Sequence, residues 1–394
     1  MIIKNKKMTS KTKTLTTVAL LSVIVLSIIP IQNVLGQIDV STVDTVSSPP
    51  SLSDEFLLSA VPTKLSEKDL VGYRDIVIHD ANILAMINGQ PFKFSSEGFI
   101  GNIYQPNSAW YPEIHITVET KSGLYQDIAI VLDPQTKSIK KTQIVEFDPS
   151  DQNGLHNAYS TQRFTGSTAA PDGIKVNLKA PTFVWDNITR AKGNALLLNG
   201  LMTGSTWVSA CTSSSIPSTY WAQIGFYWNS AGKINWTDTQ KSCLPQFPTL
   251  SYVSGKTYEF RIVGATTGWA YYAIRTDTGE TFTTRGPVVN SSTMQTPTTN
   301  DGTSVFFENK YSTSDPSWSG QFSTSPQAST AQYKTTPFGT YSNWSSTMLL
   351  EKNCSNTNFV YPYDITKQVM SGNLVSGGSA TWSVSKMQTY YPNC

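Results

Sequence analysis

The chain after residue 172 consists of short runs in which apolar and polar residues alternate, separated by turn-forming residues. Such runs cover residues 174–178, 195–198, 258–263, 269–274, 304–310 and 380–387. A period of two residues indicates β-strands with one buried face, and this region has almost no helical period. Many short strands need two packed antiparallel sheets, so we expect residues 173–394 to form an all-β sandwich of the jelly-roll or concanavalin type.

The N-terminus has the features of an export signal. Several lysines precede an apolar run over residues 15–31, and small residues follow before Gln37. This pattern predicts a secretory signal over residues 1–36, cleaved near Gly36; an uncleaved membrane anchor is the alternative. Both place the rest of the chain outside the cytoplasm or at the cell surface. Residues 37–65 are polar and predict a tether.

A smaller α+β domain is expected over residues 66–147. Ser66 is a candidate helix cap, and Asn88-Gly89 would end the helix. Apolar residues follow at helical spacing: Leu70, Tyr73, Val77, Ala81, Leu84 and Ile87. Strands are predicted over 114–118, 124–132 and 139–145, and one helix laid on this sheet would bury both apolar faces. Residues 148–172 are rich in small polar residues and predict a linker exposed to cleavage.

Cysteine number and sequence triplets fit an exported protein. The cysteines are Cys211, Cys243, Cys354 and Cys394. An even number outside the cytoplasm favours two disulfides, for which three pairings are possible; short loops favour 211 with 243 and 354 with 394. None has CxxC spacing, which argues against zinc. N-glycosylation triplets begin at Asn187, Asn235, Asn290, Asn343 and Asn353, and predict a glycoprotein.

Charge and histidine content exclude several functions. The formal net charge is +2, without basic runs after the signal, so nucleic acid is not an expected partner. His79, His115 and His156 all precede the predicted sandwich. A serine–histidine or cysteine–histidine nucleophile and a histidine metal site are therefore not expected there, and no metal or cofactor is predicted. For His79 and His115 we expect structural or solvated roles.

Residues 219–228 have the pattern of a strand that carries a site. Alternation places Ala222, Ile224 and Phe226 on one face, which we interpret as core. The other face carries Trp221, Gln223, Gly225 and Tyr227. This second face predicts an aromatic groove with a single amide, and the glycine would let a ligand approach the backbone.

Without histidine, hydrolysis in the sandwich would depend on carboxylates. Glu308 lies in an aromatic strand, where a charged group needs a partner or a groove. Glu259 is the rival, and a solvated face explains it. A glutamate can take a proton from water as general base, while the Gln223 amide donates to the developing oxyanion, so amide hydrolysis needs no metal.

These residues resemble those of a known family. The run from Trp221 to Phe226 is similar to the strand that carries the catalytic glutamine of eqolisin-type glutamic peptidases, and residues 306–309 are similar to the strand with its catalytic glutamate. The resemblance covers residues 195–322 and implies acid-acting hydrolysis of peptide bonds within a sandwich. The family's tryptophan-rich segments are not clearly present. Neprosin-type peptidases, which use two glutamates, would make Gln223 incidental. The 66–147 region resembles PepSY and cystatin-like modules that precede secreted peptidases.

Three functional hypotheses follow. The first is a secreted glutamic endopeptidase with Gln223 and Glu308 as catalytic residues, a polypeptide substrate, and the N-terminal domain as prosegment. Trp221, Tyr227 and Tyr271 would line its cleft. The second is a carbohydrate-binding module that uses the same groove for a glycan. The third is a structural surface protein whose aromatics fill the core. A membrane would be contacted only through an uncleaved signal.

Overall fold

The structure is a computed structural model that describes most of the chain after residue 51. The described residues are 52–105, 107–147, 155–164, 169–185, 194–203, 219–228, 231–238, 244–265, 268–286, 293–294, 303–312, 320–322, 327–344, 346–353, 370–375 and 379–384. Contacts divide the chain into Met1–Ser47 and Ser48–Cys394. The predicted signal lies outside the described residues, and the fold below is that of the second unit.

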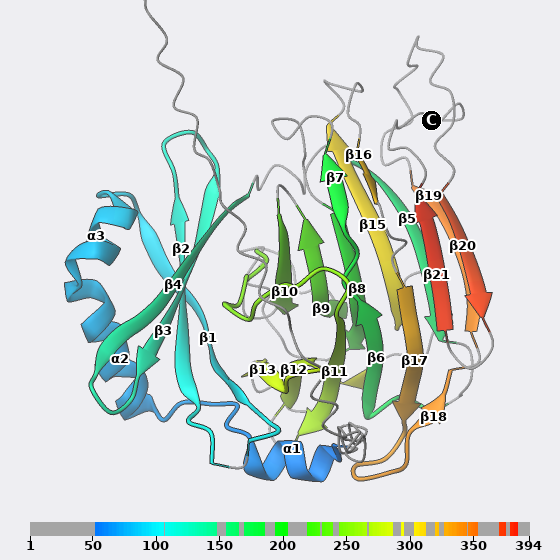
Figure 1. Ribbon diagram of the computed structural model, residues 1–394, viewed down its shortest axis with the longest axis horizontal. Coiled ribbons are helices and arrows are strands. Elements are labelled where there is room, and N and C mark those ends of the chain that lie inside the picture. Colours follow the sequence, from blue (N-terminus) through cyan, green and yellow to red (C-terminus); the bar gives the residue numbers. More distant parts are fainter. Residues whose placement is uncertain are drawn as a thin grey trace, which may run out of the picture. The chain divides into compact units, whose positions relative to one another are not determined.

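Two antiparallel sheets make up most of this unit, which confirms the predicted all-β sandwich (Figure 1). Sheet A runs in the order β20 (Met370–Val375), β21 (Ser379–Val384), β17 (Gln327–Lys334), β6 (Gly173–Lys179), β11 (Thr257–Ala265), β12 (Gly268–Arg275), β13 (Glu280–Arg285), β1 (Phe92–Asn102), β2 (Tyr111–Glu119), β3 (Tyr125–Asp133) and β4 (Ser138–Phe147), with β18 (Ser342–Asn343) beside β17. Sheet B runs β10 (Gly232–Asp238), β9 (Thr219–Trp228), β8 (Asn194–Thr203), β15 (Ser304–Ser312), β5 (Leu155–Phe164) and β19 (Ser346–Asn353), with β14 (Thr293–Met294) beside β8. A separate pair joins β16 (Gly320–Phe322) and β7 (Phe183–Trp185).

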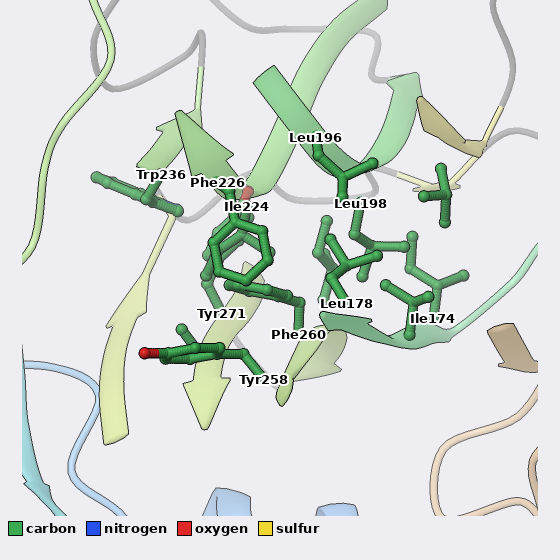
Figure 2. Packing of buried hydrophobic residues seen from close by; sticks show 14 of the residues in the cluster. Ile174, Leu178, Leu196, Leu198, Ile224, Phe226, Trp236, Tyr258, Phe260 and Tyr271 are labelled. Carbon is green, nitrogen blue, oxygen red and sulfur yellow. The ribbon is translucent and has the colours of Figure 1, made fainter. Parts of the chain in front are cut away.

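The main core lies between the two sheets (Figure 2). Sheet A contributes, among others, Leu178, Tyr258 and Phe260, and sheet B contributes Ile224 and Phe226. The Phe226 ring meets Phe260 edge to face, with centroids 5.1 Å apart. Aromatic pairs in this geometry add to the free energy gained by burial. The alternation of residues 219–228 therefore places its apolar set in the core, as the sequence predicts.

The predicted linker contains part of the sandwich, which corrects the expectation for residues 148–172. Residues 155–164 form β5, which pairs with β15 on one side and with β19 on the other. The stretch is polar and alternates weakly, so its pattern does not indicate a strand. Its backbone groups are satisfied by neighbours more than a hundred positions away in sequence, which local pattern cannot reveal.

The α+β region also shares a sheet with the sandwich. Residues 98–102 of β1 pair with residues 280–284 of β13, so sheet A continues from one region into the other. The predicted strands of this region are present as β2, β3 and β4. Its helices pack on one face of β1–β3 through a cluster that includes Ile83, Ile114 and Ile128.

Two helices replace the single predicted one. Ser66 caps α2 (Glu67–His79), as expected, and Asn88 ends α3 (Ala81–Ile87) in a left-handed conformation. Between them Asp80 is extended, and its carboxylate accepts backbone N–H groups at the start of α3. This new N-cap shifts the buried face by one position, so Ile83 is buried while Leu84 is 47% exposed.

The end of the predicted tether is also ordered. Residues 54–60 form α1 (Asp54–Ala60), capped by Ser53. Leu57 and Val61 are buried in a cluster with apolar residues of β11 and β12. Residues 54–60 include Phe56, Leu57 and Leu58, but the helix is too short for a helical period to be recognised beside the polar residues that precede it.

Candidate functional site

A row of uncharged polar residues crosses four strands of sheet B. Gln223 on β9 lies opposite Asn199 on β8 and Thr237 on β10, and Asn199 lies opposite Ser304 on β15. The Gln223 Nε2 donates to Asn199 Oδ1 at 3.2 Å. Asn199, Thr237 and Ser304 are nearly inaccessible, whereas Gln223 is half-buried. The amide predicted to act as a donor is thus the accessible member of this row.

Gly225 serves the packing of two strands, not the approach of a ligand. A Cβ atom at this position would collide with the carbonyl oxygen of Leu196 and lie 2.8 Å from the Leu197 Cα. The β8 backbone therefore occupies the space that the sequence suggested for a substrate.

Two of the three predicted cleft residues do not border an open groove. Tyr271 is fully buried in the core, and its hydroxyl donates to Asp238 at 2.7 Å. Tyr227 is 6% exposed, and its ring packs 5.1 Å from that of Phe247. Trp221, the third, is half-buried beside Gln223. The prediction failed for Tyr271 because its strand belongs to sheet A, whose inner face is covered by sheet B.

Strand register places Glu308 on the same face as Gln223 but farther along the strands. Glu308 lies opposite Ala195, whereas Gln223 lies opposite Asn199 on the same strand. Four residues of strand separate these positions by about 13 Å, in addition to two strand spacings of about 5 Å each. The Glu308 side chain lies outside the described part of the structure.

The N-terminal region covers the part of this face that leads to Glu308. Val145 and Phe147 of β4 join one buried cluster with Ala195, Leu197 and Tyr227 of sheet B. The cluster also contains Leu244 and Phe247, and the Phe147 and Phe247 ring centroids are 5.7 Å apart. Sheet A therefore reaches past the sandwich core and packs on the second face of sheet B.

A buried charged cluster, absent from the sequence predictions, joins the N-terminal region to the sandwich. His115 is fully buried; its Nε2 donates to Glu113 Oε1 at 3.1 Å and its Nδ1 donates to Asp127 Oδ2 at 3.0 Å. Asp127 also accepts the Phe247 N–H at 2.6 Å, and Glu113 accepts the Thr249 N–H at 3.0 Å. Both carboxylates thus hold the loop of residues 244–250 against β2 and β3.

The electrostatics of His115 follow from this geometry. Burial acts to lower the pKa of the imidazole, but Asp127 and Glu113 outweigh it and raise the pKa to about 10. His115 is therefore a buried imidazolium at neutral pH. Alternation correctly placed it opposite the apolar face of β2, but sequence could not show that a loop of the sandwich covers that polar face.

A cavity of about 370 Å³ lies at the junction of the two regions, away from all predicted site residues. Its lining includes Asn102, Tyr111, Lys140, Lys141 and Glu280. The Lys140 ammonium lies 4.2 Å from the Tyr111 ring centroid, and Lys141 donates to the Thr249 carbonyl at 2.7 Å. Both cations therefore already have protein partners, and the Lys141 hydrogen bond joins the two regions.

Other predicted features are partly outside the described residues. All four cysteines lie there, and so do the triplets that begin at Asn187 and Asn290. Asn235 is 4% exposed, so a glycan cannot be attached at this triplet in the folded protein. Asn343 is exposed and accepts a hydrogen bond from Gln332.

In the described ranges, no helix is both long and apolar enough to cross a bilayer. Over the same ranges, no three or more histidine, cysteine, aspartate or glutamate residues are grouped so that they could hold a metal ion. No protein-family model matches the chain, and no curated protein matches it significantly.

Proposed function

We propose that the protein is a secreted glutamic-type endopeptidase that acts in acid and is held latent by its own N-terminal region. The sandwich would be of the jelly-roll or concanavalin type, with an extended polypeptide bound across β9, β8 and β15. Gln223 would donate to the oxyanion and Glu308 would act as general base. No metal or cofactor has a role in this scheme.

One observation carries the proposal. The half-buried Gln223 amide lies among nearly inaccessible neutral polar groups, on the face to which register also assigns Glu308. Neutral donors in a place with little water stabilise developing negative charge more than they would in solvent. The cover formed by Val145 and Phe147 supports latency, because it lies over the adjoining part of the same face.

The four-residue offset between Gln223 and Glu308 favours a second candidate, a carbohydrate-binding surface. Sugar recognition needs amides and hydroxyls beside an aromatic ring, and it does not require a carboxylate close to them. The half-buried Gln223 beside the half-buried Trp221 supplies such an amide, with Asn199 and Thr237 opposite it on the neighbouring strands. In this case the protein would bind a glycan without cleaving any polymer.

Cleavage of denatured casein across acidic and neutral pH separates the two candidates. The full chain is compared with Gln223→Ala, with Glu308→Gln, and with the exposed control Glu55→Gln. Phe147→Ala, which opens the cover, is measured in parallel so that latency cannot hide activity. We expect the wild type or Phe147→Ala to cleave casein. Glu55→Gln should leave the rate of cleavage unchanged. Adding Gln223→Ala or Glu308→Gln should reduce the rate by about 100-fold or more.

Absence of casein cleavage by both the wild type and Phe147→Ala, at every pH, would overturn the peptidase proposal. Glycan-array binding by that inactive protein, lost in Gln223→Ala and Trp221→Ala, would support the second candidate instead.

A further inference from the structure

Asp54 of α1 is buried against the outer side of sheet A, where three donors converge on its carboxylate. Its Oδ1 lies 2.7 Å from the Arg261 guanidinium and its Oδ2 lies 2.9 Å from the Lys334 ammonium. The Tyr341 hydroxyl donates to the same Oδ2 at 2.8 Å. The charged side chains are at most 4% exposed. One carboxylate thus receives two cations and a hydroxyl away from solvent.

The sheet holds these donors in place without help from α1. Arg261 Nε donates to Glu259 Oε1 at 2.6 Å on the same strand. The Lys334 ammonium lies 3.5 Å from the Asp172 carboxylate. The Lys175 ammonium lies over the Tyr341 ring at 4.4 Å from its centroid. Donors that are fixed before the carboxylate arrives are typical of a ligand-binding site, whereas an ordinary ion pair forms between two flexible side chains.

The same surface has donor capacity that Asp54 does not use. Tyr272 lies opposite Arg261, and Thr283 lies opposite Tyr272, in one row across sheet A. Both side chains are fully buried, and within the described residues neither hydroxyl has a hydrogen-bond partner. Buried hydroxyls without partners are uncommon in folded proteins and point to a bound molecule or water.

An apolar contact completes the recognition of α1. Leu57 follows Asp54 by three positions, so the two lie on one side of the helix. Leu57 is fully buried and packs in a cluster with Val263, Tyr272 and Ile274 of sheet A. A helix of one or two turns is not stable alone in water, so α1 depends on this surface for its conformation.

We propose that Arg261, Lys334 and Tyr341 form a carboxylate-binding site, which Asp54 fills as a ligand supplied by the same chain. The ligand class is a short helical segment with an acidic residue followed three positions later by leucine. The site stabilises the ionised acid: burial acts to raise the pKa of Asp54, yet Arg261, Lys334 and Tyr341 outweigh it and lower that pKa. The inference is independent of the proposed catalytic function.

Chemical rescue in the full chain tests this site. Asp54→Ala removes the carboxylate group, and acetate, which can supply one, is titrated against chloride at equal ionic strength while the Tm is followed. We expect the substitution to lower the Tm by about 5 °C or more, and acetate to restore it in a saturable manner. Glu55→Ala is the matched control, since Glu55 is an exposed acid on the same helix.

A response to acetate that is equal in the wild type and in Asp54→Ala would overturn the inference. So would a rescue that persists in Asp54→Ala combined with Arg261→Met, because acetate would then bind elsewhere. If Asp54→Ala does not fold on expression, its refolding yield in acetate is compared with that in chloride. A higher yield in acetate supports the site, and equal yields contradict it.

Discussion

The imidazole Nδ1 of His115 and the Oδ2 of Asp127 lie 3.0 Å apart, and both side chains are completely shielded from solvent. With Glu113 on the other ring nitrogen, the imidazolium is held between two carboxylates. The carboxylates also hold the backbone at Phe247 and Thr249, so the cluster ties β2 and β3 to a loop of the sandwich.

We expect His115→Gln to lower the free energy of unfolding by about 3–5 kcal/mol, because two buried carboxylates would lose their cation. Denaturant unfolding followed by fluorescence measures the change. His79→Gln serves as the control, since His79 is exposed; its effect should stay within about 0.5 kcal/mol. Equal effects of the two substitutions would contradict the role assigned to the cluster.

The same residue predicts a loss of stability in alkali. The pKa of His115 rises from the ordinary 6.5 to about 10 in the folded protein. Its contribution is therefore complete below pH 6.5 and is lost as the pH rises towards 10. Over this window, the free energy of unfolding of the wild type should fall by several kcal/mol more than that of His115→Gln. If the free energies of unfolding of the two proteins change with pH in parallel, the raised pKa of His115 is contradicted.

Asp54 predicts the opposite dependence in acid. Because the folded protein lowers the pKa of Asp54 from its ordinary 3.8, the contribution of this carboxylate is present above that value and is lost as the pH falls further. The difference in unfolding free energy between wild type and Asp54→Asn should therefore be larger at neutral pH than at pH values below 3.8. A constant difference would show that the charge of Asp54 does not matter.

Two glycine substitutions should change the stability of the protein in opposite directions. Gly225→Ala would drive a methyl group into the β8 backbone, and we expect it to destabilise the protein by about 1–3 kcal/mol. Gly72 lies within α2, where an added Cβ meets nothing within 4 Å, so Gly72→Ala should stabilise by about 0.5–1 kcal/mol. Both are checked by denaturant unfolding, and a neutral Gly225→Ala would refute the close approach of the strands.

Phe147→Ala should weaken the cover over sheet B. The Phe147 ring lies 5.7 Å from that of Phe247 and 6.1 Å from that of Tyr125. Loss of this ring should lower the free energy of unfolding by about 3–5 kcal/mol. Phe92→Ala, at a phenylalanine of the same region that is 40% exposed, should cost much less. If both substitutions have the same small effect, Phe147 does not hold the cover in place.

Sequence predicted the elements that follow a strict period. Alternation predicted the core face of β9 and the strands β2 to β4, and capping chemistry predicted Ser66, because in each case one local rule decides the outcome. It failed at β5, whose weak pattern is supported by pairing with distant strands. It also failed at α1, which is too short to show a helical period and is held by the burial of Leu57 and by the ion pairs of Asp54.

The candidate site was predictable only in part. The period of two correctly assigned Gln223 and Tyr227 to one face, but the cover that buries Tyr227 comes from β4 and from the loop at Phe247. Which residues of a face stay accessible depends on contacts between segments far apart in sequence. The His115 cluster was missed for the same reason.

The pairing of β1 with β13 has a consequence for any proteolytic maturation of this molecule. A chain cut between β4 and β5 would remain a noncovalent heterodimer, because the two fragments share a hydrogen-bonded ladder from Gly98 to Asn102. If the N-terminal fragment departed, β13 would become an open sheet edge that readily recruits another strand. Departure of the fragment would thus expose an adhesive strand edge, which a second molecule or a bound peptide in extended form could occupy.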